Sequence, residues 1–187
     1  LVRLNATGSL EEPGPDMLEL CSLVSTIHQA SSGQFDPSVQ PLWMAYARAS
    51  GAPDRKALAV ARAATGWSKV EISADRIRLR PGAALTFNGI AQGFITDRVV
   101  DLLKAQGLEA GLVSVGEIAA VGASPGGTDW VVGLADREDG PADATIHLRD
   151  RAVATSSPRG TMFGPGAAGH ILDPETGMAA PANWRRV

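Results

Sequence analysis

A chain of 187 residues is long enough to bury the core of one domain, with or without two subdomains. Hydrophobic residues make up 44% and charged residues 20%, a balance that excludes a chain disordered throughout. The formal net charge of −3, with Lys and Arg scattered along the chain, gives no basic surface for nucleic acid, so we expect no nucleic-acid partner.

The N-terminal half of the chain is predicted to be mainly helical. Apolar residues recur at helical spacing over residues 16–31, where Asp16 can act as the N-cap and Gly33 stands where the helix should end. The single cysteine, Cys21, lies in this apolar run and is interpreted as a small buried core residue. The segments that follow are, in order, a loop, a short apolar stretch, an Ala-rich helix and a hairpin: 34–38, 39–46, 53–64 and 70–79.

A second strong helix is predicted in the middle of the chain. A strand over residues 84–87 leads through Asn88 and Gly89 into a helix over residues 90–105, which Gly107 ends. The predicted apolar face of this helix consists of Ile90, Phe94, Val99, Leu102 and Leu103.

After residue 107 the periodicity changes to that of strands. Short strands are predicted over residues 111–115, 118–121, 130–134, 145–148 and 152–156. Turns rich in Gly, Pro and Asp separate some of them, at residues 124–127 and 136–143, and a Gly-rich loop follows over residues 158–169. Because helices mainly precede a run of antiparallel strands, the sequence predicts the α+β fold class.

The junction at residues 86–93, which reads Thr-Phe-Asn-Gly-Ile-Ala-Gln-Gly, has features of a phosphate-binding site. Unpaired N–H groups and the dipole at a helix start attract phosphate, and glycines let a ligand approach the backbone closely. An N-cap role for Asn88 and a turn role for Gly89 explain the same residues equally well. The junction matches neither the G-x-G-x-x-G dinucleotide fingerprint nor a Walker loop.

The segment 170–177 contains the most informative histidine of the chain. His170 follows a glycine-rich loop, where a buried core histidine is not expected, and this position favours a functional role. Asp173 precedes a proline and is interpreted as a turn-forming residue. His28, on the first predicted helix, and His147, in a predicted strand, are interpreted as structural.

The segment 32–38 places an aromatic ring and a carboxylate beside a proline turn. One interpretation is that Phe35 stacks on a ring and Asp36 hydrogen-bonds a ribose or a base. The other is that the segment is only a helix exit, with Phe35 docked in the core.

Taken in order, these segments resemble the ApbE family, the FAD:protein FMN transferases. The matching segments are 3–5, 33–39, 88–93 with Asp97, 112–116, 154–156 and 170–177. Members of that family bind FAD with magnesium, cleave its pyrophosphate and attach FMN to a Thr or Ser hydroxyl of a target protein, and AMP leaves. The resemblance spans roughly residues 3 to 181 and implies that this chain is a single flavin-binding transferase domain over residues 1–187, with FAD as substrate, Mg²⁺ as cofactor and an acceptor flavoprotein as partner.

The resemblance also implies roles for individual residues. The backbone carbonyl of Gly89 would coordinate the metal, and His170 would act as the base for the acceptor hydroxyl. The cofactor-binding set comprises Gln34, Phe35 and Asp36 at the adenosine end, Thr86, Asn88 and Gln92 at the helix start, and His170 and Ile171 beside the flavin phosphates.

Some residues depart from the family pattern. Many relatives have Asp at the position of Thr86, Lys or Glu at that of Gln92, and Gly-Gly-Asp or Gly-Gly-Asn where this chain reads Val-Gly-Glu at 115–117. The side-chain metal ligands of the family are expected beyond Val187. The chain begins and ends in mid-pattern and is therefore interpreted as truncated at both ends.

Two alternatives remain beside the transferase. One is an FAD pyrophosphatase that hydrolyses FAD to FMN and AMP, and the other is a non-catalytic flavin-binding accessory protein of the same fold. By analogy with the family, the expected location is periplasmic or exported.

Overall fold

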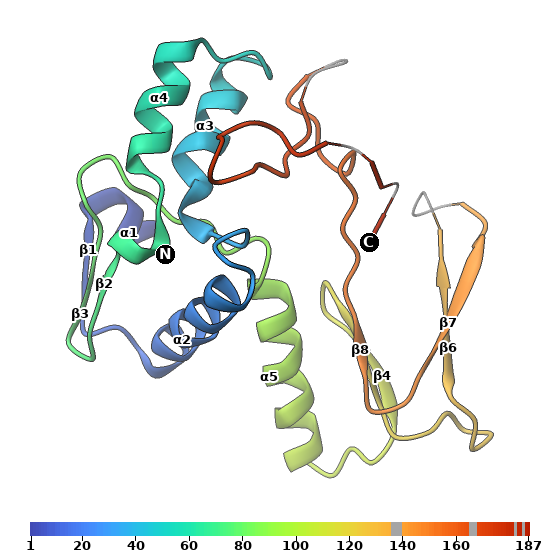
Figure 1. The fold of residues 1–187 in the computed structure, drawn as a ribbon. Coiled ribbons are helices and arrows are strands. Elements are labelled where there is room, and N and C mark those ends of the chain that lie inside the picture. The colour runs from blue at the N-terminus through green and yellow to red at the C-terminus, as the bar shows by residue number, and fades with distance from the viewer. Residues whose placement is uncertain (136–139, 165–167, 182, 185) are drawn as a thin grey trace. The chain divides into compact units, whose positions relative to one another are not determined.

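The structure is a computed structural model that describes residues 1–135, 140–164, 168–181, 183–184 and 186–187. It has helices and small antiparallel sheets, which confirms the predicted α+β class (Figure 1). The chain divides into two compact units. The first unit combines Leu1–Gly89 with Ser156–Val187, and the second unit is Ile90–Thr155.

The first unit is built from helices and one small sheet. Its α-helices are α1 (Val2–Thr7), α2 (Pro15–Ala30), α3 (Gln40–Arg48) and α4 (Arg55–Ala64), and its 3₁₀ helices are η1 (Pro37–Val39) and η2 (Trp67–Lys69). Its antiparallel sheet has the order β1-β3-β2, from β1 (Ser9–Glu11), β3 (Arg76–Arg78) and β2 (Glu71–Ile72). The last two strands form the predicted hairpin. Helix α1 and strand β1 were not predicted because they are too short to show a period.

Helix α2 confirms the predicted helix to within one residue at each end but begins differently. Pro15 takes the first helical position, where its fixed φ and missing N–H fit, so the N-cap falls on Gly14. The prediction of Asp16 as N-cap was therefore wrong, and Asp16 lies in the first turn, where its charge favours the helix dipole. Cys21 is buried as predicted, and burial raises the pKa of its thiol to about 11.

Most of the apolar stretch 39–46 lies in helix α3, which packs against the C-terminal segment of the first unit; Val39 is the last residue of η1. Leu42 and Tyr46 of α3 form a buried cluster with Ala61 of α4 and with Leu172. The ring of Phe163 stacks on that of Tyr46, with 5.4 Å between the centroids. These contacts fix residues 163 and 172 on either side of His170.

The segment 84–87 is extended but is not the predicted strand. The side-chain amide of Asn5 donates from Nδ2 to the carbonyl of Leu85 and accepts from its N–H, both at 2.8 Å. The N–H of Thr86 donates to the carbonyl of Pro37, also at 2.8 Å. The Asn5 side chain thus makes the hydrogen bonds that a neighbouring strand would make, and it fixes the backbone just before the 86–93 junction.

We expect Asn5→Asp to lower the free energy of unfolding by about 1–3 kcal/mol, because a carboxylate oxygen would replace the donor that faces the carbonyl of Leu85. Gln29→Glu makes the same chemical change at an exposed amide and should change it by less than about 0.5 kcal/mol. Urea unfolding of both variants measures the difference, and equal effects would contradict this role for Asn5.

The described residues of the second unit form one helix, α5 (Ala91–Ala105), and two small sheets. One sheet has the antiparallel order β4-β5-β8, and the other is the hairpin β6-β7. The strands are β4 (Gly111–Ser114), β5 (Ile118–Val121), β6 (Trp130–Leu134), β7 (Ala144–Leu148) and β8 (Ala152–Val153). The strands predicted after residue 107 are all present, but β8 ends at Val153, three residues before the predicted end. Residues 136–139 of the predicted turn and 165–167 of the predicted Gly-rich loop lie outside the described residues.

The predicted apolar face of α5 was wrong. Its buried side chains are Thr96 and Val100, and Val100 packs with Ala119 and Val121 of β5. Leu102, which was placed on the face, is 63% exposed. Because α5 has apolar residues on more than one side, their spacing does not determine which side is buried, and the prediction chose the wrong one.

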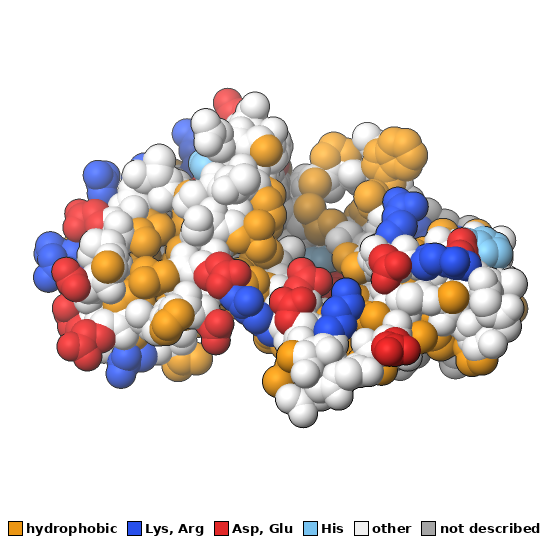
Figure 2. All heavy atoms as spheres, turned by 90° about the horizontal axis from the view of Figure 1, so that it is seen from below, with side chains coloured by type: hydrophobic (Ala, Val, Ile, Leu, Met, Phe, Trp, Pro, Cys, Tyr) orange, Lys and Arg blue, Asp and Glu red, His pale blue; other side chains and the backbone are white. Residues whose placement is uncertain are grey.

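Acidic and basic side chains are interspersed on the molecular face drawn in Figure 2, in keeping with the small net charge. Among the described residues, no helix is both long enough and apolar enough to cross a bilayer.

Candidate functional site

Two of the segments singled out in the sequence lie against each other in the first unit. The N–H of Thr86 bonds to the carbonyl of Pro37, and the ring of Phe35 lies beside Gly89. A Cβ built on Gly89 would stand 3.5 Å from Cε2 of Phe35. The 34–38 loop and the 86–89 turn, about fifty residues apart in the chain, therefore form one surface.

The turn that leads to α5 differs from the predicted cap. The N-cap of α5 is Ile90, with no side-chain hydrogen bond, so the prediction of Asn88 as N-cap was wrong. Asn88 and Gly89 are both exposed, and the N–H of Asn88 donates to Oγ1 of Thr86 at 3.4 Å. Side-chain oxygen at residue 86 thus holds the turn, while the Gly89 backbone is open to solvent.

Gln92, in the second unit, lies over the turn between β4 and β5. Its Nε2 would be 2.8 Å from a Cβ on Gly116, whose φ of +102° also favours glycine. The carbonyl of Gln92 accepts from Oγ1 of Thr96 at 2.8 Å. A side chain at Gly116 would be strained by this backbone conformation and would displace the end of the Gln92 side chain. The cofactor contact of Gln92 stays a prediction.

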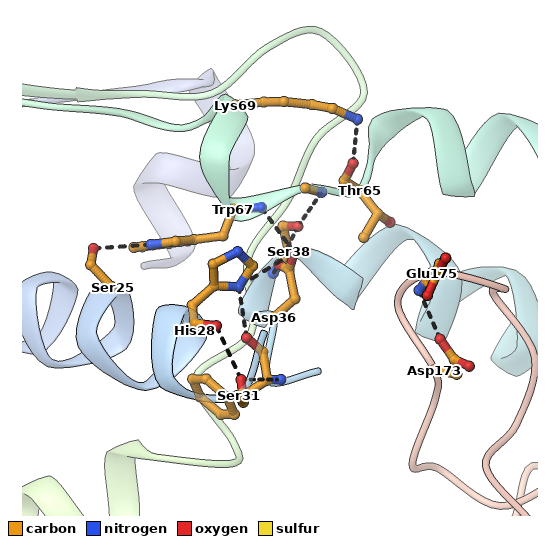
Figure 3. Close-up of polar contacts among 12 residues, drawn as sticks. Ser25, His28, Ser31, Asp36, Ser38, Thr65, Trp67, Lys69, Asp173 and Glu175 are labelled. Atoms are coloured by element: carbon orange, nitrogen blue, oxygen red, sulfur yellow. Dashed lines mark hydrogen bonds and ion pairs between the residues drawn. The ribbon is translucent and has the colours of Figure 1, made fainter. Parts of the chain in front are cut away.

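Asp36 is the centre of a buried polar network (Figure 3). Its Oδ1 accepts from the N–H and the hydroxyl of Ser38 at 2.8 and 2.5 Å, and its Oδ2 accepts from the N–H of Trp67 at 2.9 Å. Ser38 Oγ in turn accepts from the N–H of Gly66 at 2.5 Å. Both carboxylate oxygens are thus bound to protein groups, and the contact of Asp36 with a cofactor stays a prediction.

The three residues of this loop differ in exposure. Gln34 is exposed, Phe35 is half-buried and Asp36 is buried. The loop therefore combines the two interpretations of the sequence, because its carboxylate has a structural role and its amide and ring retain accessible surface. The residue that sequence reasoning undervalued is His28, whose Nδ1 lies 2.8 Å from the carbonyl oxygen of Phe35.

His170 is held by the 157–162 segment of the first unit. Its N–H donates to the carbonyl of Thr161 at 3.0 Å, and its ring Nδ1 lies 3.1 Å from the same oxygen. Because a carbonyl only accepts, Nδ1 carries the hydrogen, and in the neutral ring Nε2 has the free lone pair that a general base needs. The carbonyl of the neighbouring Ile171 accepts from the N–H of Ala180 at 2.8 Å, so Ile171 is fixed by its backbone.

Asp173 forms the turn that was predicted (Figure 3). Its Oδ1 accepts from the N–H groups of Glu175 and Thr176 at 2.8 and 3.1 Å. The hydrogen bond from the Thr176 N–H, with a smaller one from Glu175, lowers the pKa of Asp173 below its ordinary value of 3.8. The residue stabilises the chain after His170 rather than taking part in chemistry.

The stabilisation from the Asp173 charge should be present above pH 3.8 and lost as the pH falls through the lowered pKa, because only the ionised form is favoured by folding. Asp173→Asn keeps an acceptor oxygen but removes the charge. We expect this variant to be less stable than the wild type by less than about 1 kcal/mol at pH 6, since the turn is exposed, and equally stable at pH 2. Melting temperatures at both pH values measure the effect, and a gap unchanged with pH would contradict it.

The resemblance found in the sequence implies a magnesium ion at this site. In the described part of the chain, no three His, Cys, Asp or Glu side chains lie close enough together to hold a metal ion. These residues alone do not make a complete side-chain site for a metal ion. The Gly89 carbonyl as a ligand stays a prediction.

The chain is similar in sequence to proteins of one family. The family model described as "ApbE family" matches residues 1–187. A protein of Treponema pallidum named FAD:protein FMN transferase is 30% identical over 176 residues, which cover 81% of this chain and 49% of that protein. A Vibrio cholerae protein of the same name is 29% identical over 168 residues, covering 84% and 50%. The chain therefore spans about half the length of the curated relatives it matches.

Solved structures share the fold. The flavinyl transferase ApbE of Pseudomonas stutzeri, in its apo form, gives a TM-score of 0.79 at 31% identity, over 98% of this chain and 60% of that chain. The ApbE protein of Thermotoga maritima gives a TM-score of 0.83 at 26% identity, over 96% and 62%. The fold thus agrees along nearly the whole chain.

Proposed function

Because this chain belongs to the ApbE family, we propose that it acts, within its full-length protein, as an FAD:protein FMN transferase. The observation that carries the proposal is the family match over residues 1–187, together with relatives named for this activity. The surface shared by Phe35 and Gly89 supports it, because two family segments that are distant in sequence adjoin there.

In the proposed reaction, the oxygen of a Thr or Ser hydroxyl attacks the phosphorus of the FMN half of FAD. A new P–O bond joins FMN to the acceptor protein as the pyrophosphate P–O bond breaks, and AMP leaves. The hydroxyl proton passes to Nε2 of His170, whose Nδ1–H bond to Thr161 orients the ring. Phosphoryl transfer depends mainly on positioning and charge neutralisation. The protein backbone would contribute to positioning, and a bound cation would supply charge neutralisation.

We include Mg²⁺ in the proposal because transferred phosphoryl groups need their charge neutralised. The exposed backbone of Gly89 offers one candidate ligand, its carbonyl oxygen. Chelation by EDTA should then stop the transfer, and added Mg²⁺ should restore it.

The test incubates the full-length protein with FAD, Mg²⁺ and a protein substrate that carries a flavinylation threonine. We expect an increase in acceptor mass equal to FMN together with one equivalent of AMP. Free FMN and AMP with an unmodified acceptor would indicate the pyrophosphatase instead. Tight FAD binding that needs no metal and yields no product would indicate the non-catalytic flavin-binding protein.

A further inference from the structure

We propose that His28 is a positioning residue for the flavin site, because it fixes Phe35 against Gly89. The inference rests on the proposed function, in which FAD approaches the backbone at Gly89. It assigns to His28 a role beyond the structural one expected from its sequence position.

The backbone of Phe35 is held on both sides by side chains at the C-terminal end of α2. His28 Nδ1 lies 2.8 Å from the Phe35 carbonyl, and Ser31 Oγ accepts from the Phe35 N–H at 3.0 Å. Because the carbonyl only accepts, Nδ1 of His28 carries the hydrogen. The hydroxyl of Ser31 donates to the carbonyl of His28 at 3.2 Å, which joins the two supports.

The next residue anchors the same loop from the other direction. The carboxylate of Asp36 is bound by Ser38 and by the N–H of Trp67, and its Oδ2 lies 3.9 Å from Nδ1 of His28 (Figure 3). The loop therefore has little freedom to move away from α2.

The side chain of Phe35 carries this restraint to the proposed ligand surface. Its Cε2 is 3.5 Å from the position of a Cβ on Gly89, so the ring forms a wall beside the exposed glycine. A ligand that contacts the Gly89 backbone on this side would lie beside the ring. If the ring shifts, the shape of the surface changes even though no ligand-contacting residue has been replaced.

Two substitutions of His28 separate the hydrogen bond from the presence of the ring. In His28→Asn the side-chain NH₂ stands near the position of Nδ1 and keeps a donor for Phe35. In His28→Gln the NH₂ stands near the position of Nε2, and the donor is misplaced. Ser25→Ala is the matched control, because it removes a hydrogen bond of 3.0 Å from Trp67 Nε1 to the same helix without touching Phe35.

The experiment measures FAD affinity by flavin fluorescence and melting temperature in the full-length protein, with each variant also made in a Phe35→Ala background. We expect His28→Gln to raise the Kd for FAD about tenfold, and His28→Asn and Ser25→Ala to change it by less than about twofold. In the Phe35→Ala background His28→Gln should have no further effect on affinity, because the two residues act through one contact.

Equal losses of FAD affinity in His28→Asn and His28→Gln would overturn the proposal. The same tenfold loss from His28→Gln in the Phe35→Ala background would overturn it too. So would unchanged affinity in His28→Gln. These outcomes concern His28 alone, since the wild type still binds FAD in each. A wild-type protein that binds no FAD would contradict the proposed function and this inference with it.

Discussion

Replacing Gly89 by valine is expected to raise the Kd for FAD about tenfold or more, with a smaller effect on stability. The Cβ alone would stand 3.5 Å from Phe35, an ordinary contact, but the two γ-methyl groups of valine would extend from it over the exposed backbone. They would obstruct a phosphate that approaches the Gly89 N–H. Calorimetric titration with FAD and thermal unfolding of the variant measure the two effects separately.

Two alanine variants are the controls for this result. Gly89→Ala should bind FAD more tightly than Gly89→Val, because its Cβ fits beside Phe35 without displacing the ring. At Gly93 a Cβ would meet nothing within 4 Å, so Gly93→Ala should preserve binding and can stabilise α5 by up to about 1 kcal/mol. A Gly89→Val protein with normal FAD affinity would rule out close approach of the ligand at this turn.

Replacing His170 by alanine should lower the rate of FMN transfer by about 10²–10⁴ while leaving FAD affinity within a few-fold. The reason is that Nε2 would no longer be present to take the proton of the acceptor hydroxyl. His170→Asn is the sharper variant, because its NH₂ stands near Nδ1 and keeps a donor for the Thr161 carbonyl, yet it has no basic nitrogen. Both variants should lose transfer to a similar degree.

Transfer rates, FAD affinity and melting temperature of both variants distinguish a base from a structural residue. A structural residue would give an alanine variant in which stability, affinity and transfer fall together, with recovery in His170→Asn. A well-folded His170→Asn protein that transfers FMN at a near-normal rate would remove His170 from the mechanism. His147→Ala removes a strand histidine of the second unit and is the control for the loss of a histidine outside the proposed site.

The parts of this structure that sequence could predict are those with local patterns. Strands β5 and β6 were predicted at both ends, and α2 to within one residue, because their periodicity and turn residues lie within the segment itself. The candidate site was proposed from segments that resemble the family in order, and the structure brings two of them, the Phe35 loop and Gly89, together.

The parts that sequence could not predict depend on distant partners. Nothing near Leu85 shows that its backbone pairs with a side chain 80 residues away, so the segment was expected to be a strand. In the sequence Asp36 resembles a carboxylate that binds a ligand. Only the fold shows that Ser38 and Trp67 donate hydrogen bonds to its two oxygens. On α5, the choice of face depends on Ala119 and Val121, which lie beyond the helix in sequence.

The discontinuity of the first unit bears on how the protein is made. During synthesis, Leu42, Tyr46 and Ala61 leave the ribosome more than a hundred residues before Leu172, which completes their cluster. While residues 90–155 are being translated, α3 and α4 therefore lack a core partner from the C-terminal segment Ser156–Val187. Until Leu172 is made, these apolar side chains lack the partner that covers them in the structure, and exposed surface of this kind makes incomplete chains prone to aggregation. The second unit has all its residues in one stretch and can fold before the first unit closes.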